Sequence, residues 1–138
     1  MAYIGPTGIK NSFGMRFWKG TDSCCDVLGA GLDDAAYIVS LIDEASKYVN
    51  IDQKRVFLDG HSNGAFLANR VACDYADRIA GIIALGGLGY KDKSKCKPKY
   101  PVNILNVHGT SDETIFYAGG IIMGASYPSV EENIKNWA

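Results

Sequence analysis

The chain has 138 residues, of which 47% are hydrophobic and 21% charged, with a formal net charge of −1. This length and composition indicate one globular domain, residues 1–138, large enough to bury a core. A charge near zero excludes the strongly basic surface expected of a protein that binds nucleic acid or anionic membrane. The longest apolar run, residues 79–85, is far too short to span a membrane, so neither nucleic acid nor membrane is an expected partner.

Residues 1–31 are rich in glycine and are expected to form loops, with only Ala2-Tyr3-Ile4 suggesting the end of a strand. A helix is predicted from about Asp33 to Val49, because acidic residues fill its first turn and suit the helix dipole. Apolar residues recur within it at spacings of three and four. They form one face of the helix: Ile38, Leu41, Ile42, Ala45 and Val49.

Three apolar runs predict strands, at residues 55–59, 79–85 and 101–107. Between the first two runs, an alanine-rich stretch from about Asn63 predicts a helix whose small residues allow close packing on a sheet. Apolar strands that alternate with helices and lack polar alternation indicate a parallel sheet covered on both faces. The sequence therefore predicts an α/β fold.

The remaining segments are predicted as connections and one short helix. The basic stretch 91–99 is interpreted as a solvated loop rather than a binding patch. Ser129 is expected to cap a last helix, with Glu131 and Glu132 in its first turn.

Residues Gly60-His61-Ser62-Asn63-Gly64 spell G-x-S-x-G between the first predicted strand and the alanine-rich helix. This context is typical of a nucleophile elbow, in which a serine on a strained turn exposes its hydroxyl above a sheet. A positive φ is expected at Ser62. The flanking glycines are expected to avoid Cβ clashes where the backbones of strand and helix meet. The alternative interpretation is that Ser62 is an ordinary helix N-cap.

A serine nucleophile needs a base to accept its proton and an acid to orient that base. Asp112 fits the acid, because it lies in the loop just beyond a predicted strand, at the edge where ligands bind in parallel sheets. The alternative for Asp112 is a loop-capping role. No base is evident: no histidine follows Asp112, His61 should point away from Ser62, and His108 is expected to be hydrogen-bonded inside the strand–loop junction.

Half of an oxyanion hole is also expected. One donor would be the backbone N–H of Asn63, assisted by the positive end of the helix that starts there. The second donor normally comes from a loop after an earlier strand, and nothing before residue 31 supplies a recognisable version of it.

With these residues the chain resembles the polyhydroxybutyrate-depolymerase and feruloyl-esterase group of α/β-hydrolases. The similarity runs through most of the chain and is far more specific than the pentapeptide. It is carried by Trp18 with Cys24-Cys25, Asp33-Asp34, Ile51-Asp52, Arg55-Val56-Phe57, Gly60-His61-Ser62-Asn63-Gly64-Ala65, Cys73-Asp74, Cys96-Lys97-Pro98, His108-Gly109-Thr110-Ser111-Asp112, Ser129-Val130-Glu131-Glu132 and Trp137-Ala138.

The resemblance implies a three-layer α/β/α fold with a mostly parallel sheet, incomplete at both ends. It implies a serine esterase that hydrolyses small-molecule or polymer carboxylic esters through a Ser62 acyl-enzyme, with Asp112 as the triad acid. No metal or organic cofactor is implied. Many members of the group are secreted, although residues 1–6 show no signal peptide.

Members of the group carry an oxyanion loop ahead of the first residue of this chain and a catalytic histidine beyond its last. The chain is therefore expected to be the central part of such an enzyme. A missing segment, or a second copy in a homo-oligomer, would complete the site. The alternative function is a poorly active or non-catalytic module that binds a ligand.

The four cysteines show no C-x-x-C spacing, and the two histidines do not pair with them at ligand spacing, so no zinc site is expected. Disulfides and buried free thiols both remain open. A Cys73–Cys96 disulfide is predicted, because the helix after Ser62 and the loop entering the next strand should be neighbours in this fold.

Overall fold

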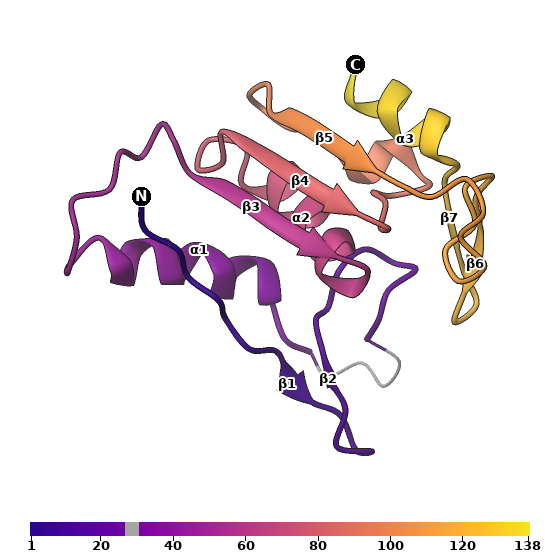
Figure 1. The fold of residues 1–138 in the computed structure, drawn as a ribbon, viewed down its shortest axis with the longest axis horizontal. Coiled ribbons are helices and arrows are strands. Elements are labelled where there is room, and N and C mark those ends of the chain that lie inside the picture. Colours follow the sequence, from indigo (N-terminus) through magenta and orange to yellow (C-terminus); the bar gives the residue numbers. More distant parts are fainter. Residues whose placement is uncertain (27–30) are drawn as a thin grey trace.

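The computed structural model describes residues 1–26 and 31–138, so the end of the glycine-rich region, residues 27–30, lies outside the described part. The central sheet has three parallel strands in the order β3-β4-β5. Their bounds are β3 (Phe57–His61), β4 (Gly81–Leu85) and β5 (Asn103–Val107). Figure 1 shows the three arrows pointing the same way, so their carboxyl ends meet at one edge.

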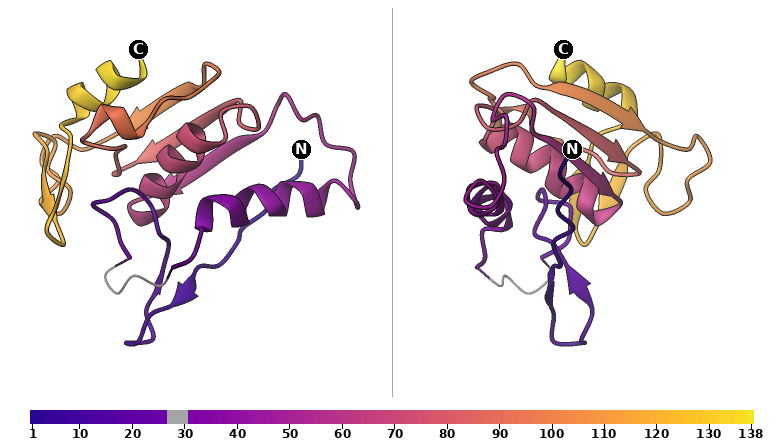
Figure 2. Two further views of the ribbon diagram at one scale, coloured as in Figure 1. Left: turned by 180° about the vertical axis from the view of Figure 1, so that it is seen from behind. Right: turned by 60° about the vertical axis from the view of Figure 1, so that its left-hand side comes forward.

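Three α-helices accompany the sheet: α1 (Asp34–Ala45), α2 (Asn63–Asp74) and α3 (Val130–Trp137). Helix α2 packs against β3 and β4, α1 packs against α2, and α3 contacts β5. Seen from behind in Figure 2, α2 lies across the sheet with α1 beside it. The parallel α/β architecture predicted from the sequence is confirmed. No helix in the described part is long and apolar enough to cross a membrane.

Ser129 caps the last helix as expected, whereas Asp33, expected inside the first turn of its helix, is the N-cap residue instead. The Asp33 side chain accepts a hydrogen bond from the Ala36 N–H and so caps α1. Ser129 and Glu132 form a reciprocal capping box at the start of α3. Helix α1 ends at Ala45 and gives way to turns, four residues before the predicted end at Val49.

The main core lies between the two long helices and one face of the sheet. Alanines on α2 are buried there and let the helix lie close to the strands. Aliphatic side chains from α1 and β4 fill the remaining space, including Ile38, Ile42 and Ile82. A second cluster joins α2 to the C-terminal part of the chain, where the rings of Phe66 and Tyr127 meet edge to face with centroids 6.3 Å apart.

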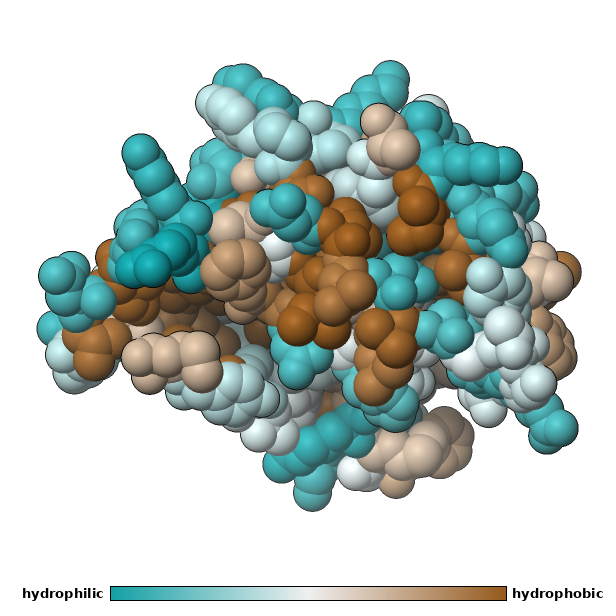
Figure 3. Space-filling model, turned by 45° about the horizontal axis from the view of Figure 1, so that its top comes forward, coloured by the Kyte–Doolittle hydropathy of each residue, from teal (hydrophilic) through white to brown (hydrophobic). Residues whose placement is uncertain are grey.

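The opposite face of the sheet is open, and the expected third layer is not seen in the described part. Phe57 is 62% exposed and Leu105 is 55% exposed, and further apolar side chains of β4 and β5 are also open: Ile83, Leu85 and Val107. Figure 3, which is turned toward this side, shows apolar side chains gathered across its middle. The described helices that pack against the strands include none that covers these residues, because α2 occupies the other face.

Two short antiparallel ribbons complete the structure. The first pairs β1 (Ile9–Lys10) with β2 (Arg16–Phe17), and the second pairs β6 (Gly120–Ile122) with β7 (Ala125–Tyr127). The sequence predicted neither ribbon. The strand suggested at Ala2-Tyr3-Ile4 is wrong, because these residues are irregular. The basic stretch 91–99 is a connection, as predicted, and contains one short 3₁₀ turn, η1 (Lys93–Lys95).

Candidate active site

Ser62 occupies the single-residue turn between β3 and α2. Its backbone has φ 51° and ψ −117°, a combination that L-residues rarely adopt, and the positive φ is the one expected from the sequence. Ser62 is in the N-cap position of α2, yet its side chain makes no capping hydrogen bond. The ordinary N-cap interpretation is therefore not supported. Its backbone N–H donates to the Leu85 carbonyl at 2.8 Å, which ties the turn to the end of β4.

The two glycines of the motif differ in their surroundings. A Cβ on Gly60 would lie 2.7 Å from the Ala65 nitrogen and would also overlap the Gly64 carbonyl, so only glycine fits there. A Cβ on Gly64 would meet nothing within 4 Å. The expectation that both glycines prevent a clash is thus correct for Gly60 and wrong for Gly64. Gly60 faces the helix, whereas the Cα of Gly64 faces open space.

The start of α2 presents backbone donors beside Ser62. The Ser62 carbonyl accepts the N–H groups of Ala65 and Phe66, at 2.9 and 3.2 Å. The N–H of Asn63 precedes both and donates to no acceptor within the described part of the chain. A free N–H at the positive end of a helix is a favourable position for a negatively charged oxygen. The role of Asn63 as an oxyanion donor stays a prediction.

Asp112 lies in the loop after β5 and is held by the backbone that follows it. Its Oδ1 accepts hydrogen bonds from the N–H groups of Thr114 and Ile115, both at 2.9 Å. These two hydrogen bonds, with a smaller contribution from His108, hold the pKa of the Asp112 carboxyl below its ordinary value. The other oxygen, Oδ2, accepts no hydrogen bond from the described residues, so it is the oxygen available to a base.

The structure brings Ser62 and Asp112 to the same end of the sheet. The Ser62 N–H is bonded to Leu85, and the next residue, Gly86, would place a Cβ 3.7 Å from Asp112 Oδ2. Gly86 has φ 62°, which glycine adopts without strain. The two predicted site residues therefore flank the carboxyl end of β4. No hydrogen bond joins them in the described part, so a third group is needed to connect them.

No hydrogen bond joins either histidine to Ser62 within the described residues. The His108 side chain is only 1% exposed, and its Nε2 donates to the Ile115 carbonyl at 2.6 Å. Since a carbonyl only accepts, Nε2 carries the hydrogen and cannot take a proton from Ser62. Nε2 also lies 3.7 Å from Asp112 Oδ2, which makes His108 a neighbour of the acid. His61 is exposed at the end of β3 and precedes Ser62 directly.

The cysteines are paired in the structure. Cys73 on α2 and Cys96 after η1 form a disulfide, with Cα atoms 5.4 Å apart, within the range that a disulfide allows. Cys24 and Cys25 are also joined to each other. No group of three or more histidine, cysteine, aspartate or glutamate side chains within the described residues is suited to hold a metal ion.

Sequence reasoning missed two features next to the site. The β6–β7 hairpin lies at the carboxyl edge of the sheet (Figure 1), and its turn has positive φ at Met123 and Gly124, 53° and 82°. A glycine two residues after paired isoleucines was the available signal for this turn. The second feature is the packing of the segment around Trp18 and Cys24 against Asn63, for which no local pattern exists.

Comparison with known proteins places these features in a family. A family described as phospholipase/carboxylesterase matches residues 30–135. Feruloyl esterase B of Piromyces equi is 30% identical over 129 residues, covering 88% of this chain and 23% of that protein. A bifunctional acetylxylan esterase/xylanase of Neocallimastix patriciarum is 32% identical over 107 residues, covering 78% of this chain and 14% of that protein.

An acetylxylan esterase of Coprinopsis cinerea is 28% identical over 88 residues, covering 59% of this chain and 24% of that protein. The chain thus spans about a quarter or less of the length of these three relatives. No solved structure matches. The family match extends over most of the chain and includes both the Ser62 turn and the Asp112 loop. The chain belongs to the phospholipase/carboxylesterase family of α/β-hydrolases.

Proposed function

We propose that the chain is part of a serine esterase that hydrolyses carboxylic esters through an acyl-enzyme on Ser62. The observation that carries this proposal is the Ser62 turn, where a strained backbone holds a hydroxyl that does not cap the helix it precedes. Strain of this kind persists only when its surroundings enforce it, and it gathers at functional sites. Gly60 and the bond to Leu85 are the surroundings that enforce it here.

The proposed reaction uses groups that the chain places at one edge of the sheet. Ser62 Oγ attacks the carbonyl carbon of the ester and passes its proton to a base. The Asn63 N–H stabilises the oxyanion that forms, and the alcohol leaves with the proton from the base. Water then releases the acid from Ser62 by the same steps. Asp112 orients the base through Oδ2, the oxygen that its own loop leaves free.

We further propose that the base comes from another polypeptide segment, either a further part of a longer chain or a second copy. The engaged Nε2 of His108 supports this proposal. The open apolar face of the sheet supports it too, because parallel sheets are normally covered on both sides. A segment seated there would supply the third layer of an α/β/α fold. Sedimentation velocity tests the second-copy form: a dimer of the unmodified chain that Leu105→Lys converts to monomer supports it.

The relatives suggest the substrate class. One is named for feruloyl esters and two for acetylxylan, so we propose esters of hydroxycinnamic or acetic acid as substrates, with polyesters as a further class. The two disulfides suit an extracellular, oxidising location, which we propose for the native protein.

The test combines turnover with covalent labelling. We expect slow hydrolysis of p-nitrophenyl acetate. An esterase without its base retains a rate enhancement of about 10³–10⁴ over the reaction in water. A fluorophosphonate should label Ser62, as located by mass spectrometry. Ser62→Ala should abolish both signals, whereas Ser126→Ala, a change at an exposed serine, should abolish neither. Absence of labelling and turnover in the unmodified chain would favour a ligand-binding module instead.

His108→Ala separates a structural histidine from a catalytic one. Because His108 is buried and bonded to Ile115, its loss should lower thermal stability while Ser62 labelling persists below the unfolding temperature. If the unmodified chain turns esters over robustly and His108→Ala stays folded but loses this turnover, His108 is the base. That result would contradict the need for another segment.

A further inference from the structure

A short piece of irregular chain beside Ser62 has all its backbone groups held by side chains. Trp18 and Lys19 follow β2 and belong to no sheet. The Lys19 N–H donates to Asp34 Oδ2 at 2.6 Å, and the Lys19 carbonyl accepts from Arg70 Nη1 at 3.1 Å. The two Trp18 groups bond to a single residue, Asn63. Side chains thus satisfy every backbone N–H and C=O of these two residues, which fixes the segment in place.

Asn63 bonds Trp18 in the way that a neighbouring strand would. Its Oδ1 accepts the Trp18 N–H at 2.7 Å, and its Nδ2 donates to the Trp18 carbonyl at 2.8 Å. Nδ2 also donates to the Cys24 sulfur at 3.4 Å. A flipped amide would set donor against donor and acceptor against acceptor, so the orientation is determined. Only an asparagine-like side chain offers both functions at this length.

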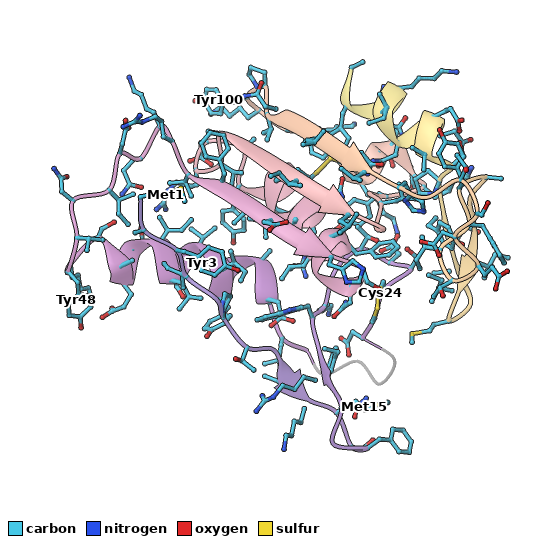
Figure 4. All side chains as sticks on the ribbon, in the orientation of Figure 1. Met1, Tyr3, Met15, Cys24, Tyr48 and Tyr100 are labelled. Atoms are coloured by element: carbon cyan, nitrogen blue, oxygen red, sulfur yellow. A yellow bond between two sulfur atoms is a disulfide. The ribbon has the colours of Figure 1, made fainter. Side chains whose placement is uncertain are left out.

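The held segment rests directly on the first turns of α2. A Cβ on Gly20 would lie 2.7 Å from the Phe66 Cβ and 3.0 Å from the Leu67 nitrogen. Figure 4 shows Cys24 beside the end of β3, where the Ser62 turn begins. The segment 18–24 therefore packs on the first turns of α2, which begins directly after Ser62, and Asn63 is the residue that joins this segment to the start of the helix.

Asn63, which holds segment 18–24, is also the residue whose backbone N–H is the proposed oxyanion donor. Asn63 is the first residue of α2, and its N–H has no acceptor among the described residues. This N–H lies in the same peptide plane as the Ser62 carbonyl, which the Ala65 and Phe66 N–H groups hold from the helix. The two bonds to Trp18 hold Asn63 from the opposite side, so its peptide group is restrained on both sides.

We propose that the Asn63 side chain is a positioning residue of the ester site. By locking segment 18–24 to α2, it fixes the direction of its own backbone N–H toward the oxyanion. This inference rests on the proposed esterase function. An N–H that is misdirected weakens an interaction made only in the transition state, so its loss lowers kcat and leaves KM nearly unchanged.

The test compares two asparagines of α2 that each hold a tryptophan. Asn63→Ala removes the bonds to Trp18, and Asn69→Ala removes the bond from the Trp137 indole N–H to Asn69 Oδ1, 3.1 Å long. Asn69 is buried and lies along the helix from the Ser62 turn, so it serves as a structural control. With p-nitrophenyl acetate, measured below the unfolding temperature of both variants, we expect kcat to fall about 10- to 100-fold for Asn63→Ala only.

A second variant covers the case in which Asn63→Ala does not fold. Asn63→Asp keeps an acceptor for the Trp18 N–H and adds a charge that a helix start tolerates, but it loses both Nδ2 donations. Its kcat, measured below its own unfolding temperature, should fall relative to that of the unmodified chain.

Three outcomes would overturn the inference. Equal losses of kcat in the Asn63 and Asn69 variants would assign Asn63 a purely structural role. An unchanged kcat in Asn63→Asp would show that the Nδ2 bonds do not position the N–H. If Ser62→Ala hydrolyses the ester as fast as the unmodified chain, the proposed function fails, and the inference fails with it. Only the first two outcomes leave the esterase proposal standing.

Discussion

Replacing Gly60 by alanine adds one methyl group where β3 and α2 approach most closely. That methyl carbon would lie 2.7 Å from the Ala65 nitrogen and would overlap the Gly64 carbonyl. All these atoms belong to the backbone, so no flexible side chain can move aside. Inserting a methyl group into a packed site costs about 1–3 kcal/mol, and sometimes more. We expect Gly60→Ala to lower the free energy of unfolding by about 3 kcal/mol, because either the helix or the strand must shift.

Gly64→Ala is the matched control, with the opposite sign expected. Its added methyl group meets nothing within 4 Å, and Gly64 lies in the first turn of a helix. Alanine there should raise the free energy of unfolding by about 0.5–1 kcal/mol, since glycine loses more backbone entropy on folding. Both substitutions replace a glycine of the same motif by alanine, so the two variants have the same composition and net charge.

Thermal unfolding followed by far-UV circular dichroism measures both changes. A domain of this size loses about 4 °C of melting temperature per kcal/mol, so Gly60→Ala should melt about 12 °C lower than the unmodified chain. Gly64→Ala should melt slightly higher. The reasoning is refuted if Gly60→Ala is as stable as the unmodified chain, or if Gly64→Ala is destabilised to the same degree.

Two further predictions concern stability. Asp112 has a lowered pKa because the Ile115 and Thr114 N–H groups bond its carboxylate. The contribution of the ionised carboxylate to the free energy of unfolding is therefore fully present above the unfolded pKa of about 3.9, and it is lost as the pH falls through the lower folded pKa. In urea unfolding, the stability difference between the unmodified chain and Asp112→Ala should stay constant from pH 7 to about pH 5 and shrink below pH 4; a difference that grows on acidification would contradict this. The Cys73→Ser/Cys96→Ser double variant should lose about 3 kcal/mol, and equal urea midpoints would exclude a stabilising disulfide.

Local patterns predicted the parts of the fold that depend on neighbouring residues. The acidic first turn located the start of α1, and the glycine before Ser62 located the turn into α2, because backbone space and capping are decided within a few residues. The position of Asp112 beyond β5 followed from the length of the apolar run before it. These features needed no knowledge of distant contacts.

Other features depend on contacts between distant segments and left no local pattern. A run such as 101–107 predicts that a strand is buried on at least one side, but not that its second side is open, as it is at Leu105. The engagement of His108 by Ile115 depends on how the loop folds back. The pairing of Trp18 with Asn63 joins residues that are 45 positions apart.

The bonds of Asn63 also bear on how the chain ages chemically. Asn63 precedes Gly64, and in a flexible Asn–Gly pair the glycine nitrogen readily attacks the side-chain carbonyl carbon, expelling ammonia and forming a succinimide that opens to aspartate or isoaspartate. In the folded chain, Trp18 and Cys24 hold both ends of the amide, so it cannot rotate toward Gly64. We therefore expect deamidation at Asn63 to be slow in the native protein and rapid in urea, as peptide mass spectrometry of aged samples would show. Each unfolding event would then expose Asn63, the residue beside Ser62, to irreversible deamidation. The rate at which Asn63 deamidates on storage therefore reports how often the region around it unfolds.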